Sequence, residues 1–166
     1  MRQDNNYAIL ALGSNIKSRK ANLKTALGKI KEVIGPIVSI SSIYESDPVD
    51  YLKQERFLNL VLKVQINKRL NPISLLNLTQ SIEQNMGRIK TIPKGPRNID
   101  IDILYFNDEV YQDDRLTIPH PAIYDRPFVL IPLVDIAPNK IFSNQLIEKF
   151  RNSKGFKKIS PSLDIH

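Results

Sequence analysis

The segment at residues 98–106, NIDIDILYF, constrains the fold more than any other stretch of this chain. Isoleucines alternate there with Asp100 and Asp102. Because successive side chains of a β-strand point to opposite faces, the pattern predicts a strand with one apolar face. The two carboxylates follow one another on the other face.

Hydrophobic periodicity predicts two helices and three further strands before that segment. Alternating or short apolar runs predict strands at residues 7–12, 37–46 and 57–66. Apolar residues at helical spacing predict helices at residues 18–34 and 72–87, which Gly35 and Gly87 end. The resulting order, β-α-β-β-α-β, is that of a ferredoxin-like split βαβ fold of the α+β class, with helices packed on an antiparallel sheet.

The C-terminal third carries shorter patterns. We expect a turn at Asn107-Asp108, a short strand near Val110 that completes a hairpin with the preceding strand, and a short helix near residues 127–135. These extra C-terminal elements would cover part of the other face of the sheet. The basic segment 153–166 is weakly patterned, and we expect a loosely held tail.

Composition and charge narrow the class of protein. With 166 residues, 42% of them hydrophobic and 25% charged, we expect one domain over residues 1–166. The absence of cysteine excludes disulfides and thiolate metal sites. The N-terminal sequence lacks the pattern of a signal peptide or membrane span, so we expect a cytoplasmic protein without a membrane partner. We also expect a monomer. The net charge of +7 favours anionic partners without choosing among them.

The aspartates lie between basic residues on both sides in the sequence. These basic residues are Arg88, Lys90, Lys94, Arg97, Arg115, His120 and Arg126. Magnesium is usually held by one or two carboxylates together with substrate phosphates, and arginine binds phosphate oxygens in bidentate fashion. The arrangement therefore suits a polyphosphate with bound metal, although a solvated strand face would carry the same two aspartates.

A second set of residues suits a flat heterocycle. Asn59 lies among apolar strand residues, and its amide can offer donors and an acceptor to a ring edge. Phe57 lies two residues earlier, on the same strand face, and Phe128 could supply a second ring. The alternatives are an outward-facing Asn59 and two ordinary core phenylalanines.

Six sequence blocks in order make the chain resemble a known family. The blocks are LGSN (12–15), SSIYES (41–46), FLN (57–59), GR (87–88), GPRNIDIDIL (95–104) and RLTIPHP (115–121). From about Tyr7 to about Phe150 the chain resembles the 6-hydroxymethyl-7,8-dihydropterin pyrophosphokinases of folate biosynthesis. The resemblance implies transfer of pyrophosphate from ATP to the pterin hydroxymethyl group, with release of AMP.

The resemblance also implies a set of site residues. Asp100 and Asp102 would bind two magnesium ions, and with Arg88 and Arg97 they would be the catalytic residues. The implied ATP-binding residues are Leu76, Gln80, Glu83, Arg88, Arg97, Ile103, Arg115, Thr117, His120 and Arg126. The implied pterin-binding residues are Gly13, Ser46, Val49, Phe57, Asn59 and Phe128.

The chain departs from the family pattern at three positions. Lys94 stands where the family often has a tryptophan, Phe57 where it often has a tyrosine, and Pro121 where some members have a tyrosine. Two other interpretations compete with that of a pyrophosphokinase. One is a different two-metal nucleotidyl or phosphoryl transferase, and the other is a non-enzymatic RNA-binding module. The strands lack the aromatic-and-basic signature of RNA binding, so we expect small-molecule substrates and no nucleic acid.

Overall fold

The fold is α+β, as the sequence predicts. The computed structural model describes residues 6–49, 52–87, 95–137, 140, 142–161 and 163. Its elements are β1 (Tyr7–Ser14), α1 (Arg19–Val33), β2 (Ile37–Ile40), β3 (Ile43–Ser46), β4 (Phe57–Gln65), α2 (Pro72–Asn85), β5 (Asp100–Phe106), β6 (Tyr111–Gln112), β7 (Thr117–Ile118), the 3-10 helix η1 (Pro121–Tyr124), α3 (Pro127–Ile136), α4 (Asn144–Arg151) and β8 (Phe156–Ser160). None of the helices in these ranges combines the length and the apolar composition that a membrane span requires.

The main sheet has its strands in the order β5-β1-β4-β3-β8, and β2 also pairs with β4. Every pair is antiparallel. Strands β1 and β4 are therefore central, which is the strand arrangement of the ferredoxin-like fold. The register sets Gly13 of β1 opposite Asp100 of β5 on one side and opposite Asn59 of β4 on the other.

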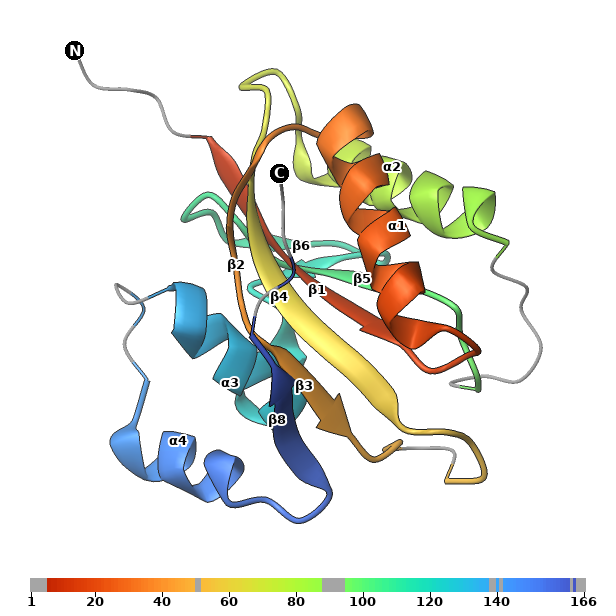
Figure 1. Cartoon of the computed structure of the whole chain (residues 1–166). Coiled ribbons are helices and arrows are strands. Elements are labelled where there is room, and N and C mark those ends of the chain that lie inside the picture. Colours follow the sequence, from red (N-terminus) through yellow and green to blue (C-terminus); the bar gives the residue numbers. More distant parts are fainter. Residues whose placement is uncertain are drawn as a thin grey trace.

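The sheet separates two apolar cores. Helices α1 and α2 cover one face, and α3 and α4 lie on the other side (Figure 1). The α1–α2 core includes Leu10, Leu12, Leu23, Leu60, Leu75, Ile101 and Ile103. The α3 core includes Ile9, Val61, Leu104, Leu130, Ile131 and Leu133. The isoleucines of β5 thus face α1 and α2, which turns Asp100 and Asp102 toward the α3 side.

The predicted strand 37–46 is wrong as a single element, because it divides into β2 and β3. The interruption lies at Ser41, whose backbone N–H donates to the carbonyl oxygen of Val61 at 2.8 Å. The Ser41 hydroxyl also accepts from the Val61 N–H at 2.9 Å. A side chain therefore replaces part of the backbone ladder, and the strand breaks there.

The predicted hairpin between residues 98–106 and Val110 is also wrong. Strand β6 pairs with β7 rather than with β5. The connecting turn is held by Asp113, whose Oδ1 accepts from the N–H groups of Arg115 and Leu116, both at 2.8 Å. This local side-chain capping forms a turn that the hydrophobic pattern does not indicate.

The C-terminal segment differs from the loosely held tail that we expected. Residues 156–160 form β8, which pairs with β3 in the main sheet. An edge strand leaves unpaired backbone groups, and β8 satisfies those of β3. Helix α4, for which we made no prediction, precedes β8 and packs through Phe150 into the α3 core.

Candidate active site

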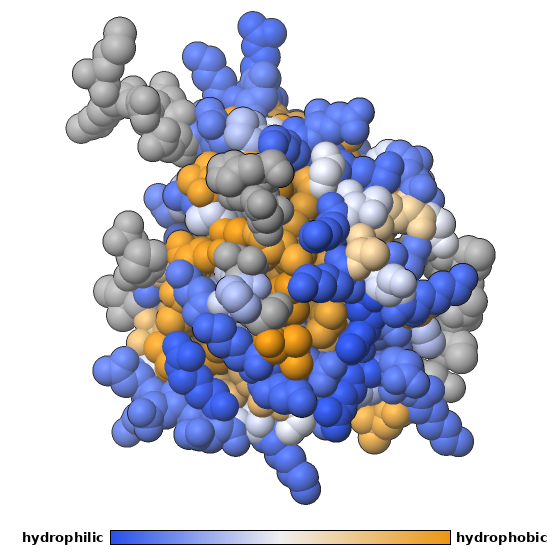
Figure 2. Space-filling view, in the orientation of Figure 1, coloured by the Kyte–Doolittle hydropathy of each residue, from blue (hydrophilic) through white to orange (hydrophobic). Residues whose placement is uncertain are grey.

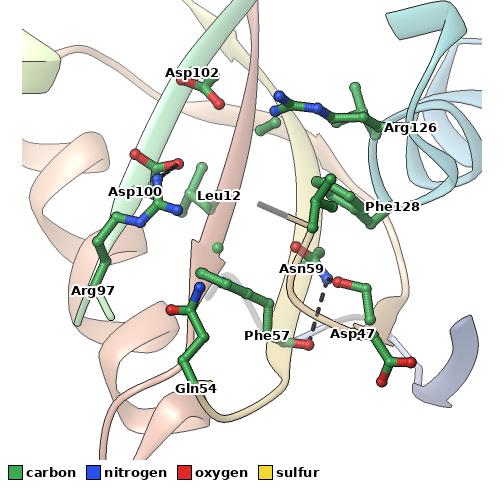
Figure 3. A pocket seen from close by; sticks show the side chains of 15 residues that line it. Leu12, Asp47, Gln54, Phe57, Asn59, Arg97, Asp100, Asp102, Arg126 and Phe128 are labelled. Atoms are coloured by element: carbon green, nitrogen blue, oxygen red, sulfur yellow. Dashed lines mark hydrogen bonds and ion pairs between the residues drawn. The ribbon is translucent and has the colours of Figure 1, made fainter. Parts of the chain in front are cut away.

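A pocket opens on the α3 side of the sheet, above β1, β4 and β5 (Figure 3). It encloses about 620 Å³, counting its open side, which is within the usual size range of small-molecule sites. All six residues that we expected to bind the pterin line it, together with Arg97, Asp100, Asp102 and Arg126. The remaining lining residues are Ala11, Leu12, Asp47, Gln54 and Val129.

The Asn59 amide has a fixed orientation in this pocket. Asn59 is buried, and its Nδ2 donates to Ser46 Oγ at 2.9 Å and to the Tyr44 carbonyl oxygen at 3.2 Å. Because Nδ2 makes these contacts, the amide oxygen Oδ1 points toward Gly13. A Cβ atom on Gly13 would lie 3.5 Å from Asn59 Oδ1 and 3.5 Å from Phe57 Cδ1. The bare backbone of Gly13 thus forms the floor between the amide and the ring.

Each phenylalanine of the pocket carries an arginine over its ring. The Arg97 guanidinium carbon lies 5.3 Å from the Phe57 ring centre, and that of Arg126 lies 5.8 Å from the Phe128 ring centre. Both arrangements are within the range of cation–π attraction. The two rings come from β4 and α3, so an apolar slot and two cationic groups lie in one cavity (Figure 3).

Asp100 and Asp102 supply the acidic side of the pocket. Arg97 Nη1 lies 3.1 Å from Asp100 Oδ2, and Arg97 Nε donates to the Gly95 carbonyl oxygen at 3.1 Å. The side chains of Arg97 and Asp100 each expose 22% of their surface, so both remain accessible to a ligand.

These two carboxylates can hold magnesium, which the family resemblance implies. Magnesium requires oxygen ligands and accepts one or two carboxylates when phosphates and water complete its coordination. In the described part of the chain, no cluster of three or more His, Cys, Asp and Glu residues could enclose a metal ion. The donor set of Asp100 and Asp102 therefore fits an ion shared with a phosphate ligand better than an ion enclosed by protein alone.

Asn15 joins the two loops beside the pocket. Its Nδ2 donates to Gln54 Oε1 at 2.8 Å and to the Glu55 carbonyl oxygen at 3.0 Å. Its Oδ1 accepts from the Arg97 N–H at 2.8 Å, and its own N–H donates to the Arg97 carbonyl oxygen at 3.0 Å. Sequence reasoning missed this role, although the LGSN block ends at Asn15.

The charges of Arg126 and Asp100, two residues of the pocket, affect the pKa of His120. Burial lowers the pKa of His120 below 6.5, and the Arg126 charge lowers it further, while Asp100 opposes the change. The ring Nδ1 accepts a hydrogen bond from the Ala122 N–H at 3.1 Å. In the neutral ring this leaves the proton on Nε2, so the imidazole is a hydrogen-bond donor at that atom.

The other expected ATP-binding residues lie outside the residues that line the pocket. Arg115 Nη2 contacts Gln80 Oε1 at 3.3 Å and Asn77 Oδ1 at 2.9 Å, which joins α2 to the turn before β7. Leu76 and the buried Glu83 lie on α2 as well. Thr117 lies in β7, and Ile103 has its side chain in the α1–α2 core. Arg88 and Lys94 lie outside the described residues.

Sequence reasoning also missed two polar residues that line the pocket. Asp47 follows β3, and Gln54 lies in the loop before β4. Neither belongs to a periodic segment, so only their place between the SSIYES and FLN blocks could have indicated them.

The fold and the pocket together define an α+β protein with a small-molecule site, in which carboxylates and arginines lie beside an aromatic slot. Sequence comparison specifies the family. The family model for 7,8-dihydro-6-hydroxymethylpterin-pyrophosphokinase (HPPK) matches residues 9–138. The chain belongs to this family and is a pyrophosphokinase.

Comparison with individual proteins leads to the same family. The chain is 47% identical over 133 residues to the 2-amino-4-hydroxy-6-hydroxymethyldihydropteridine pyrophosphokinase of Bacillus subtilis, covering 80% of this chain and 78% of that protein. It is 36% identical over 156 residues to the enzyme of that name from Haemophilus influenzae, covering 90% and 96%. The folic acid synthesis protein fol1 of Schizosaccharomyces pombe is 45% identical over 82% of this chain, which spans 19% of that longer protein.

Solved structures support the fold. The Plasmodium falciparum HPPK-DHPS protein, crystallised in wild-type form with pterin and p-hydroxybenzoate, superposes with a TM-score of 0.71 at 20% identity. The match covers 94% of this chain and 47% of that chain. At this identity the likeness concerns the fold alone.

Proposed function

We propose that the protein transfers pyrophosphate from ATP to the hydroxymethyl group of 6-hydroxymethyl-7,8-dihydropterin, giving the pterin diphosphate and AMP in folate biosynthesis. The observation that carries the proposal is the sheet register, in which Gly13 alone separates Asp100 from Asn59. A carboxylate that would hold a phosphate-bound metal ion is thereby set beside an amide that would recognise a heterocycle. Family membership supplies the identity of the two substrates.

The pterin ring would lie in the slot between Phe57 and Phe128, against the floor at Gly13. The Asn59 oxygen faces this floor and can accept a hydrogen bond from an N–H group on the ring edge. Ser46 and Val49 line the same cavity, and their backbone groups can complete the contacts of the ring.

The triphosphate would lie on the acidic and basic side of the pocket. Asp100 and Asp102 would hold two magnesium ions, which neutralise phosphate charge when bound. Arg97 and Arg126 would bind phosphate oxygens, and Arg88 is proposed for the same role. The Nε2–H of His120 would donate to a further phosphate oxygen, because its Nδ1 is already occupied.

In this reaction the protein would contribute mainly by positioning the two substrates and stabilising the charge that develops. The pterin hydroxyl oxygen forms a bond to the β-phosphorus of ATP, and the bond from that phosphorus to the α,β-bridging oxygen breaks. AMP takes the electron pair of the broken bond, and the hydroxyl proton is released. Arg97 is anchored by Gly95 and Asn15 at the edge of the pocket, so it presents its charge without first being ordered.

An AMP-release assay with ATP, magnesium and the reduced pterin alcohol tests the proposal. We expect AMP and pterin diphosphate in equal amounts, and almost none from the Asp100→Ala, Asp102→Ala double variant. AMP formation that does not require the pterin would instead identify another two-metal transferase. Absence of magnesium-dependent ATP binding would leave the RNA-binding alternative.

A further inference from the structure

The C-terminal segment 153–160 lies against the strand that forms one wall of the pocket. Strand β8 lies beside β3 (Figure 1). The register of the pair sets Phe156 opposite Ser46. The segment follows the part of the chain that the family model matches, residues 9–138.

Gly155 contacts Asp47, a residue that lines the pocket. The Asp47 N–H donates to the Gly155 carbonyl oxygen at 2.9 Å, and Asp47 lines the pocket. Gly155 has a φ angle of +74°, and a Cβ atom there would overlap the Asp47 carboxylate. Arg56 Nε lies 2.9 Å from Asp47 Oδ1, so the carboxylate is held between the arginine and the glycine.

The same strand pair fixes the Asn59 amide. Both main acceptors of Asn59 Nδ2 belong to β3, namely Ser46 Oγ and the Tyr44 carbonyl oxygen. Tyr44 in turn stacks on Phe156, with ring centres 5.3 Å apart and planes 5° from parallel. A displacement of β8 would therefore move the two atoms that orient Asn59.

We propose that the segment 153–160 is a positioning element for the pterin pocket. The segment contacts Tyr44, Ser46 and Asp47 on the side of β3 that faces away from β4. It thereby sets the direction of the Asn59 amide and so the affinity for the heterocycle. This inference rests on the proposed function, because it takes the pterin as the ligand of the slot. It assigns no contact between the segment and the nucleotide.

The variant Gly155→Ala tests the inference, with Lys154→Ala as the matched control. Lys154 is the exposed neighbour of Gly155. Binding of 6-hydroxymethylpterin is followed by fluorescence in the presence of magnesium and a non-hydrolysable ATP analogue, and binding of the analogue is measured separately. For Gly155→Ala we expect the pterin dissociation constant to rise roughly tenfold and that of the nucleotide to stay within about twofold. Lys154→Ala should leave both constants unchanged.

The double variant Gly155→Ala, Asp47→Ala separates displacement of the wall from general instability. Removing the carboxylate makes room for the added methyl group, so pterin affinity should return to that of Asp47→Ala alone. The melting temperature of the double variant should remain below that of Asp47→Ala alone, because alanine at a positive φ remains strained. If Gly155→Ala does not fold, Phe156→Leu takes its place, since it removes the stacking on Tyr44 and keeps an apolar side chain.

Three outcomes decide between the inference and the function on which it rests. Wild-type pterin affinity in a folded Gly155→Ala variant, or in Phe156→Leu, would overturn the inference. Equal loss of pterin and nucleotide binding would also overturn it, because a positioning role predicts loss on the pterin side alone. If the wild-type protein itself bound nucleotide but not the pterin, the proposed function would fail first.

Discussion

Asp100 and Asn59 lie in the same row of the sheet, with only Gly13 between them. Neighbouring strands are about 4.8 Å apart, so the backbones of the two residues lie about 10 Å apart across the sheet. Their side chains enter one cavity from β5 and β4 (Figure 3). The space above Gly13 is therefore where a ring held at Asn59 and a phosphate held near Asp100 would meet.

A methyl group on Gly13 should reduce pterin binding with little effect on folding. The added carbon would lie at ordinary van der Waals distance from Asn59 Oδ1 and the Phe57 ring, and Gly13 has no positive φ. We expect Gly13→Ala to raise the KM for the pterin at least tenfold, because the methyl group occupies the floor of the slot, and to leave the KM for ATP unchanged.

Gly28→Ala is the matched control for that substitution. Gly28 lies within α1, and nothing lies within 4 Å of an added Cβ. We expect this variant to gain about 0.5–1 kcal/mol of unfolding free energy, because alanine favours a helix over glycine. Its steady-state kinetics should match the wild type. A Gly13→Ala enzyme with unchanged pterin KM would contradict the assigned floor of the pocket.

Replacing the Asn59 amide should affect the pterin and not the nucleotide. Asn59→Ala removes the acceptor that faces the slot and leaves Ser46 Oγ without its donor. We expect a stability loss of about 1–2 kcal/mol, typical of a broken buried hydrogen bond, and a pterin affinity at least thirtyfold weaker. Fluorescence titration with the pterin and calorimetry with the ATP analogue measure the two ligands separately; a parallel loss of both would argue against a pterin-specific role.

Asp100→Asn should abolish most activity while the protein stays folded. The change removes a negatively charged oxygen ligand and the ion pair with Arg97. Partial exposure of that pair limits its stability effect to less than about 1 kcal/mol. We expect kcat to fall at least a hundredfold and the magnesium concentration for half-maximal rate to rise.

Asp108→Asn supplies the control for the loss of an aspartate. Asp108 pairs with Lys140 at 3.2 Å and follows the far end of β5, outside the residues that line the pocket. Its variant should keep the wild-type rate and the wild-type magnesium dependence. If both variants lost activity to the same degree, the assignment of Asp100 to metal binding would be wrong.

The lowered pKa of His120 predicts that acid destabilises the protein in a definite window. The unfolded-state pKa is near 6.5 and the folded-state pKa is lower, so the unfolded chain binds more protons between the two values. Stability from this group is complete above pH 6.5 and falls as the pH drops toward the folded-state pKa. Urea unfolding between pH 5 and pH 8 should therefore show a smaller decline on the acid side for His120→Gln than for wild type. A proton NMR titration that gave His120 a pKa above 6.5 would exclude this account.

The sequence predicted those parts of the fold that depend on local periodicity. The alternation around Asp100 placed both aspartates on one face of β5, and helical spacing located α1 and α2. It failed where one strand chooses among distant partners. Ser41 breaks the long strand by bonding to Val61, twenty residues away, and β8 fills an edge that only the folded sheet creates. Such pairing is decided by tertiary structure rather than by the pattern of a single segment.

The candidate site was predicted mainly through short sequence blocks. Residue chemistry indicated Asn59 and Phe128, family resemblance added Gly13, and the structure places all three around one cavity. The bonds of Asn15 to Gln54 and Arg97 could not be predicted, because they join loops without periodicity that come together only after β1, β4 and β5 have paired.

The pairing of β8 with β3 also affects how the molecule behaves among copies of itself. Without β8, the backbone N–H and C=O groups of β3 would be open to strand addition by a second molecule. Shortening the chain after Asn152 would therefore move the open edge of the sheet from β8 to β3, the strand whose residue Ser46 lines the proposed substrate pocket. A strand added there by a second molecule would lie beside the pocket, so self-association and the proposed ligand affinity would both depend on whether Phe156–Ser160 is present.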